Sequence, residues 1–368
     1  MRIVIIADPI DEQYAGVHYY TKHLIEGMLK IDKQNEYIFI HTRPNDFFTG
    51  QKEVIIPNYR WLPGWMILRK FLFISFTLWK IKPNVVFEPA HFGPFSFLWS
   101  CEKIVTIHDL TPVLFPQFHI NISCFIHKLF LPFILRNADG ILVPSECTKK
   151  DIEILYQPEI PIQVTYEAVS EDFHPSSKEQ IREITDKFGI MKPYILSVGT
   201  LEPRKNLITL LKAYKILREK GHDYQLVIVG KKGWYCKKLL EEIASFGKDI
   251  IITNYIQRNQ LSAFYSGAKV MVFPSLYEGF GLPPLEAMHC GCPVICSNTS
   301  SLPEICGKAA KLVNPNNSEE LEKILQKILT DDNIQSVMMQ QGIKQAKKFS
   351  WEKCAIETIK FFETLVCC

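Results

Sequence analysis

The chain has 368 residues, of which 47% are apolar, and its formal net charge at pH 7 is +3. This length exceeds one ordinary hydrophobic core and suits two domains. The small charge, with no basic block and no aromatic-basic repeat, gives no support for a nucleic-acid-binding protein. The 11 cysteines are an odd number scattered over apolar segments, which is typical of reduced thiols in a cytosolic protein.

The first half of the chain alternates short apolar runs with helical patterns. It begins with MRIVIIADPI, a strand rather than a signal peptide, because the apolar run is short and ends at Asp8. The apolar runs lack polar alternation, which favours strands buried in a parallel sheet. The strands expected here are Arg2–Ala7, Tyr37–His41, Val85–Phe87, Ile104–Ile107, Ile141–Val143 and Val164–Tyr166.

Two windows of this half contain no acidic residue, namely Tyr59–Pro83 and Leu110–Ala138. The apolar run Phe71–Trp79 is far too short to span a bilayer. Basic-aromatic helices can lie on anionic bilayers, in which case Arg69 and Lys70 should face the lipid. The alternative is that both windows form ordinary helices packed on the sheet of the first domain.

A polar segment with proline, from Glu167 to Ser177, predicts the linker between two domains. We place the domains at residues 1–172 and 173–350. The alternation of strands and helices on both sides of the linker favours two doubly wound α/β domains. The strands expected in the second are Tyr194–Val198, Leu226–Val229, Ile250–Ile252, Val270–Phe273 and Val294–Cys296.

The stretch FPSLYEGFGLPPLEAMHCGCPVICSNTSSLPEICG, from Phe273 to Gly307, is the most informative part of the chain. Glu278 and Glu286 flank a Gly-Phe-Gly-Leu-Pro-Pro turn that joins an expected strand to an expected helix. The glycines allow the backbone to approach a ligand closely. Ligands of open parallel sheets bind at the carboxyl ends of strands, and carboxylates there are good acceptors for sugar hydroxyls. The alternative is that Glu278 caps the turn and Glu286 is surface charge.

Arg204 and Lys205 lie between an expected strand and a helix that Asn206 opens. Cations beside a helix amino terminus form an anion site, with arginine as a planar fork and lysine as a mobile point charge. The same pair, taken alone, is more often a solvated helix start. His108 ends a strand and can hydrogen-bond a substrate, or it can cap the strand together with Asp109.

No metal site is expected. The chain has no Asp-x-Asp motif, so no metal bridge to a diphosphate is required. Cys290, Cys292, Cys296 and Cys306 lie close in the sequence, but their spacing fits no zinc pattern. No Gly-x-Gly-x-x-Gly motif follows a strand, which disfavours a nicotinamide enzyme.

Taken together, these motifs resemble the retaining, nucleotide-sugar-dependent glycosyltransferases of family 4, which have the GT-B fold. The resemblance rests on Phe273–Gly307, Val198–Leu207 (VGTLEPRKNL), His108–Pro112 (HDLTP), Ala15–Val17 and Ser350-Trp351, and it extends from Met1 to about residue 366. It is strongest to the bacterial mannosyltransferase-like branch that builds lipid-linked polysaccharides.

The resemblance implies two Rossmann-like domains facing across a cleft, with an acceptor-binding amino-terminal domain and a nucleotide-sugar-binding second domain. A last helix, at about 351–366, should cross back onto the first domain. The implied reaction moves a hexose, with mannose favoured, from a nucleotide-diphosphate sugar to a glycan or lipid-linked acceptor with retention. No cofactor or metal is implied, and the donor is GDP-mannose or a UDP-hexose. The implied location is the cytoplasm, with peripheral association to the membrane as an open alternative.

The resemblance also implies the roles of single residues. His108 and Glu278 contact the transferred sugar, and Arg204 and Lys205 hold the diphosphate. Many relatives carry a further arginine after the loop glycine, where this chain has Thr200. The other implied donor-site positions are Gly16 at the first strand-to-helix turn, Glu286 at the ribose, Tyr255 and Ile256 at the base, and Gly279, Phe280, Gly281 and Leu282 along the loop. The competing functions are a GT-B nucleotide-sugar epimerase or hydrolase and a non-catalytic scaffold.

Overall fold

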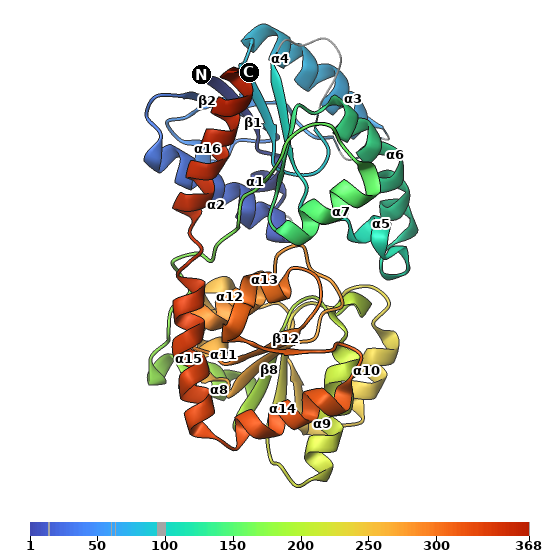
Figure 1. Cartoon of the computed structure of the whole chain (residues 1–368), viewed down its shortest axis with the longest axis vertical. Helices are drawn as coiled ribbons and strands as arrows, with labels where there is room; N and C mark the ends of the chain where they lie inside the picture. Colours follow the sequence, from blue (N-terminus) through green and yellow to red (C-terminus); the bar gives the residue numbers. More distant parts are fainter. Residues whose placement is uncertain (14, 60, 63, 94–100, 368) are drawn as a thin grey trace. The chain divides into compact units, whose positions relative to one another are not determined.

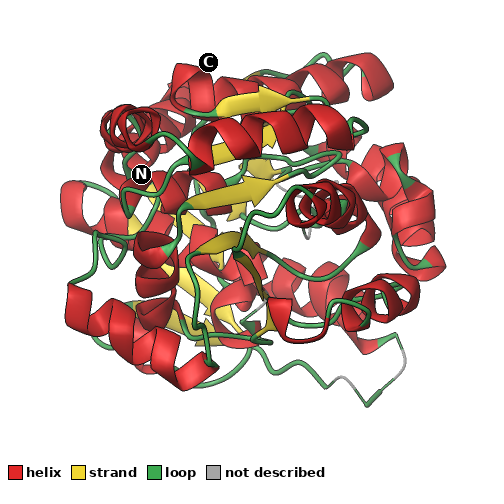
Figure 2. Cartoon of the chain, turned by 90° about the horizontal axis from the view of Figure 1, so that it is seen from below, coloured by secondary structure: helices red, strands yellow, loops and turns green. Residues whose placement is uncertain are grey.

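The computed structural model describes residues 1–13, 15–59, 61–62, 64–93 and 101–367 (Figure 1). The chain divides into two compact units. Unit 1 comprises Met1–Leu114, Asn121–Glu167 and Ser350–Cys368, and unit 2 comprises Phe115–Ile120 and Ala168–Phe349. The strands lie in the interior, with helices around them (Figure 2).

Unit 1 contains a parallel sheet of seven strands in the order β3-β2-β1-β4-β5-β6-β7. The direction of strand addition reverses between β1 and β4, which makes this the switch point of the sheet. Alternate residues of β1 enter two separate hydrophobic clusters, one on each face of the sheet. The strands are β1 (Arg2–Ile6), β2 (Glu36–His41), β3 (Lys52–Ile55), β4 (Val85–Glu88), β5 (Glu102–Thr106), β6 (Gly140–Val143) and β7 (Ile162–Val164).

The helices of unit 1 cover both faces of this sheet. They are α1 (Asp8–Glu12), α2 (Ala15–Ile31), α3 (Trp65–Leu68), η2 (Arg69–Ile74), α4 (Ser75–Ile81), α5 (Thr111–Leu114), α6 (Asn121–Asn137), α7 (Glu146–Tyr156) and α16 (Trp351–Cys367), with the short 3-10 turn η1 (Asp46–Phe48). The last helix, α16, packs against α2 at the other end of the chain, and a Cβ at Gly27 would lie 3.0 Å from the Trp351 carbonyl.

Unit 2 repeats the same strand order, β10-β9-β8-β11-β12-β13, with its switch point between β8 and β11. All neighbouring strands are parallel. The strands are β8 (Tyr194–Val198), β9 (Gln225–Val229), β10 (Ile250–Ile252), β11 (Val270–Phe273), β12 (Val294–Ser297) and β13 (Lys311–Val313). The helices are α8 (Lys178–Phe188), α9 (Leu207–Glu219), α10 (Lys237–Ala244), α11 (Arg258–Gly267), α12 (Leu282–His289), α13 (Leu302–Cys306), α14 (Ser318–Leu329) and α15 (Asp332–Ala346).

The unit boundary differs from the one predicted from the sequence. It falls after Glu167 rather than after residue 172, because the intervening segment packs on unit 2. There the Asp172 carbonyl accepts a hydrogen bond from Ser262 Oγ, and the Phe173 ring lies 6.1 Å from the Tyr265 ring. The segment Phe115–Ile120 also belongs to unit 2.

A buried network of charges lies at the carboxyl edge of the unit 1 sheet, on both sides of its switch point. Arg69 is 1% exposed and donates to both Asp8 oxygens, at 2.5 and 2.8 Å. Lys70 donates to buried Glu88 at 3.0 Å and to the Phe92 carbonyl. The expectation that Arg69 and Lys70 face a lipid surface is therefore wrong, because both side chains reach inward to carboxylates.

Candidate active site

The loop after β8 is shaped by glycine and asparagine. Gly199 has a φ of 150°, and a Cβ at Gly230 in the next strand's loop would lie 1.9 Å from the Gly199 carbonyl, so the two loops touch through their backbones. The chain then makes the short 3-10 turn η4 (Pro203–Lys205) and enters α9 through Asn206. The Asn206 amide donates to the carbonyls of Pro274 and Pro315, which fixes the turn that carries the two cations.

The loop between β11 and α12 is anchored by serines of the following loop. Ser301 Oγ donates to the carbonyls of Glu278 and Phe280, at 2.9 and 2.6 Å, and the Glu278 N–H donates to Ser300 Oγ. Gly281 has a φ of 117°, and a Cβ there would lie 2.8 Å from Leu302. A residue with a side chain would therefore be strained at this position, because the left-handed region and the neighbouring leucine both exclude it.

These two loops bring Glu278, Arg204 and Lys205 into one cluster. Lys205 Nζ lies 2.6 Å from Glu278 Oε1, and Arg204 Nη1 lies 2.9 Å from Glu278 Oε2. Arg204 also donates to the Tyr277 carbonyl and to Glu202, each at 2.7 Å. The Glu278 carboxylate accepts a further bond from Ser275 Oγ, so a buried anion is held by two cations and one hydroxyl.

The pKa values of Glu278 and Lys205 are both lowered from their ordinary values. Burial acts to raise the pKa of Glu278, but the Arg204 and Lys205 cations outweigh it and hold that pKa below the ordinary value. Burial, with Arg204 adding to it, lowers the pKa of Lys205, and Glu278 opposes this shift. The two cations thus pair with two buried carboxylates, Glu278 and, through Arg204, Glu202.

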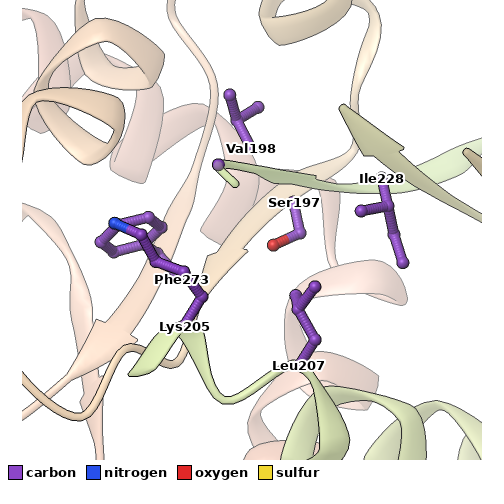
Figure 3. A pocket seen from close by; sticks show the side chains of 7 residues that line it. Ser197, Val198, Lys205, Leu207, Ile228 and Phe273 are labelled. Atoms are coloured by element: carbon purple, nitrogen blue, oxygen red, sulfur yellow. The ribbon is translucent and has the colours of Figure 1, made fainter. Parts of the chain in front are cut away.

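A small pocket, too tight to hold a water molecule, lies beside this cluster at the carboxyl ends of β8, β9 and β11, next to the switch point of the unit 2 sheet (Figure 3). The Lys205 ammonium lies over the Phe273 ring, 4.8 Å from its centroid. The pocket lies where ligands of such sheets bind. It is lined by Ser197, Val198, Gly199, Lys205, Leu207, Ile228 and Phe273.

Glu286 lies on α12 and is held by partners that the motif did not indicate. Its carboxylate accepts 2.7 Å and 2.9 Å bonds from Arg258 Nη2 and the Tyr265 hydroxyl, and it is 4% exposed. Arg258 in turn lies over the Phe173 ring, 4.7 Å from its centroid. Glu286 is therefore not surface charge. Arg258 and Tyr265 were missed because only the fold brings α11 beside α12.

The other donor-site positions predicted in unit 2 lie on its loops and on α12. Tyr255 and Ile256 follow β10, the first 67% exposed and the second buried. Gly279 and Phe280 precede α12, Phe280 is 5% exposed, and Leu282 is the first residue of that helix. Their predicted contacts with the donor stay predictions.

Two predicted positions lie in unit 1. His108 follows β5, with Nδ1 3.3 Å from Glu167 Oε1 and Nε2 2.8 Å from the Pro89 carbonyl. Asp109 accepts bonds from the Thr111 N–H and hydroxyl, which caps α5. Gly16 is the second residue of α2 and not part of a turn, so the expected strand-to-helix turn at Gly16 is wrong. The reason is that α1 already occupies the segment directly after β1.

The described residues contain neither a metal-binding cluster nor a membrane-spanning helix. Within the residues that the structure describes, no three or more His, Cys, Asp or Glu side chains are grouped so that they could hold a metal ion. Over the same residues, every helix is too short or too polar to cross a membrane.

Two parallel sheets with the strand order of doubly wound domains define a GT-B protein, and the ion cluster of Arg204, Lys205 and Glu278 lies at the switch point of the second sheet. Residues 178–347 match the family model of glycosyl transferases group 1. The O-antigen chain mannosyltransferase B of Escherichia coli is 34% identical, over 99% of this chain and 100% of the relative. The chain belongs to the family of glycosyl transferases group 1 and is a glycosyltransferase.

Other comparisons agree with this assignment. The serotype-specific mannosyltransferase WbdA of Escherichia coli is 32% identical over 78% of this chain and 37% of its own length. Sucrose-phosphate synthase from Thermosynechococcus elongatus superposes with a TM-score of 0.78 at 20% identity, covering 100% of this chain and 99% of that chain. Anabaena Alr3699/HepE, in complex with UDP and glucose, has a TM-score of 0.76 at 14% identity, covering 99% and 100%. These likenesses confirm the fold predicted from the sequence.

Proposed function

We propose that the chain transfers a mannosyl residue from a nucleotide-diphosphate sugar, GDP-mannose before a UDP-hexose, to a lipid-linked glycan at the cytoplasmic membrane face. Support for mannose comes from the two Escherichia coli relatives, both mannosyltransferases by name. The observation that carries the proposal is the cluster of Glu278, Arg204 and Lys205 beside the pocket of unit 2. It supplies two cations where a departing diphosphate gains charge and one carboxylate for sugar hydroxyls.

The ion pairs of this cluster suggest how the donor binds. Glu278 pairs with both Arg204 and Lys205, and Glu202 also pairs with Arg204. A diphosphate offers more negative charge and more acceptor atoms than one carboxylate, so it competes for both cations. Once they bind phosphate, Glu278 is free to accept from the hydroxyls of the transferred sugar. Arg204 and Lys205, as long as they pair with Glu278, hold its pKa below the ordinary value against the effect of burial, so the carboxylate is ionised before the donor binds.

We propose that transfer retains the anomeric configuration by front-face substitution. The departing phosphate oxygen then takes the proton of the acceptor hydroxyl as that hydroxyl attacks the same face. Arg204 and Lys205 stabilise the leaving group, a role that typically accounts for about 10²- to 10³-fold in rate for one donor. With two cations at the phosphates, we propose that the enzyme needs no metal ion. Transfer should persist in excess EDTA, and strict dependence on Mg²⁺ or Mn²⁺ would contradict this.

One assay tests the function against its competitors. The purified chain is offered GDP-mannose, UDP-glucose, UDP-galactose and UDP-N-acetylglucosamine, with and without a polyprenyl-diphosphate-linked sugar. We expect nucleotide release that requires both GDP-mannose and the acceptor, and an α-linked product by NMR. Release or epimerisation without acceptor would instead indicate the epimerase or hydrolase function. No turnover of any donor, with the ion cluster intact, would indicate a scaffold.

A further inference from the structure

Unit 1 exposes a row of large apolar side chains on the continuous helical segment 65–81, which consists of α3, η2 and α4. Leu68, Leu72, Phe76 and Trp79 follow one another at helical intervals, so they share one face of this segment. Their exposed fractions are 40%, 59%, 57% and 61%. Side chains of this size are normally covered, so a row of them marks an interaction surface.

The same surface continues onto α6. The Phe71 ring of η2 packs against the Phe133 ring of α6, with centroids 6.2 Å apart, and the two helical segments lie near each other in Figure 1. α6 in turn exposes three large side chains at helical spacing, each between 55% and 62% exposed. We define the apolar face as Leu68, Leu72, Phe76, Trp79, Ile122, Phe125 and Leu129.

The charged residues on the two helical segments that carry the apolar face are all basic. The sequence has no Asp or Glu from Ile55 to Phe87 or from Leu110 to Ala138. The exposed charges on these helices are basic: Lys80 and Lys128 both reach solvent, and Lys80 Nζ lies 4.4 Å from the centroid of the Phe76 ring. Arg69 and Lys70 do not take part, because they bind Asp8 and Glu88 inside unit 1.

We infer that the apolar face docks unit 1 on the surface of an anionic lipid bilayer. Its aromatic and aliphatic side chains enter the boundary between head groups and acyl chains, and the lysines at its rim contact lipid phosphates. A second copy of the chain fits less well, since a two-fold contact would set basic rims against each other. The inference deepens the proposed function by naming the surface that meets a lipid-linked acceptor.

Vesicle binding by the full chain tests the inference without catalysis. We compare sedimentation with vesicles of phosphatidylcholine and phosphatidylglycerol in equal parts and with vesicles of phosphatidylcholine alone. The chain should bind the anionic vesicles more tightly, and raising the salt should remove most of the difference. Replacing Lys80 and Lys128 by glutamine should weaken anionic binding by about fivefold per residue, and binding to phosphatidylcholine should change little.

A triple variant tests the apolar part of the surface. Leu72→Ser with Phe76→Ser and Trp79→Ser should lower binding to both kinds of vesicle by about tenfold or more. The matched control is Ile154→Ser with Leu155→Ser on α7, whose side chains are 62% and 41% exposed in the same unit but lie off the apolar face. The control should bind like the unchanged chain, and both variants should keep their thermal unfolding midpoint.

Failure of the inference is separable from failure of the proposed function. Transfer to a water-soluble acceptor analogue should proceed equally in the triple variant and the unchanged chain, so that assay reports on catalysis alone. The inference is wrong if the unchanged chain fails to bind anionic vesicles at low salt. It is also wrong if the triple variant binds these vesicles as tightly as the unchanged chain. A dimer in light scattering that the triple variant dissociates would also overturn it, since the face would then join two copies.

Discussion

The Glu278 carboxylate is the anion that pairs with the two cations beside it. Lys205 and Arg204 lie 2.6 and 2.9 Å from the carboxylate, and all three side chains are largely covered. Removing one partner of a buried ion pair is costly because it leaves a charge without compensation. The arrangement therefore keeps the cations in place before a donor arrives, and it makes each of them sensitive to substitution.

Replacing Lys205 by alanine should lower transfer by roughly 10²-fold or more, because the leaving diphosphate loses a charged donor. Arg204→Ala should have a similar effect. Lys215→Ala is a matched control, since this lysine is exposed on the neighbouring helix α9. Initial rates of nucleotide release measure all three variants. Near-normal turnover in both site variants, with folding retained, would remove the assigned role.

The two glutamates should separate in their kinetic effects. Glu278→Gln should mainly lower kcat, because its contact with the sugar strengthens as positive charge develops in the transition state. Glu286→Gln should mainly raise the donor KM, since ribose contacts are the same in ground and transition state. Steady-state kinetics over a range of donor concentrations measure both constants. The reverse pattern would exchange the two roles, and no effect in either would remove the donor site from this loop.

The structure adds a stability test to the second glutamate. Glu286 is 4% exposed and paired with Arg258, so Glu286→Gln should also lower the unfolding free energy. Tyr265→Phe removes only the hydroxyl that donates to Glu286 and serves as a milder companion. Glutamine has the shape of glutamate, and shape alone predicts unchanged stability. It lacks the charge that pairs with Arg258, however, so we expect a loss. Denaturant unfolding of both variants measures the difference.

Glu88 should make the stability of unit 1 depend on pH. Burial raises the pKa of Glu88 from 4.5 to about 7, against the opposing effect of Lys70. The folded state therefore binds a proton between these pH values that the unfolded state has released. The unfolding free energy should fall as pH rises from 4.5 to 7, by at most about 1.4 kcal/mol per pH unit. Glu88→Gln should flatten this slope in denaturant titrations, and an unchanged slope would contradict the assignment.

At the scale of elements, the strands with an apolar run could be predicted from the sequence, the edge strand β10 among them, whereas the edge strands β3 and β13 could not. β8 is buried along its whole length, and its apolar run is plain in the sequence. β3 contains Lys52 and Glu53 at the sheet edge, and β13 has three residues of which only Val313 is buried. Neither strand shows an apolar run, because most of their side chains are exposed or only partly buried. The loop glutamates and cations were found by motif, but their pairings with Arg258 and Tyr265 exist only in the fold.

The loops that follow β8 and β9 contact each other through their backbones, and a glycine substitution tests this contact. Gly230→Ala would place a Cβ 1.9 Å from the Gly199 carbonyl, so the loops must separate. We expect a loss of about 3 kcal/mol in unfolding free energy, the upper range for overpacking, and weaker donor binding. Gly16→Ala is the control, since nothing lies within 4 Å of its Cβ and alanine favours a helix. Chemical denaturation of the two variants should move in opposite directions.

At the scale of the whole molecule, the fold could be predicted because both halves repeat one pattern. Each unit has the strand order of a doubly wound sheet, and each follows from alternating apolar runs and helices. The unit boundary could be predicted less well from the sequence, because the segment from Ala168 to Phe173 has the composition of a linker but packs on unit 2. The last helix is a further long-range feature: α16 joins unit 1 although the unit 2 segment Ala168–Phe349 separates it from α7.

This connection predicts that unit 1 depends on the end of the chain. Phe362 of α16 is fully buried, and its ring lies 5.3 Å from the Phe87 ring of β4. Phe362→Ala should cost about 3–5 kcal/mol, as truncations of buried aromatic residues do. Ile356→Ala, on the same helix but 38% exposed, should cost far less.

Amide hydrogen exchange locates the effect of that loss. In Phe362→Ala the amides of β1, β4 and α2 should exchange faster, whereas those of β8, β11 and α9 should keep their protection, because α16 belongs to unit 1. Faster exchange throughout both units would show that the chain unfolds as one cooperative body. Unchanged exchange in β4 and α2 would show that α16 contributes little to unit 1.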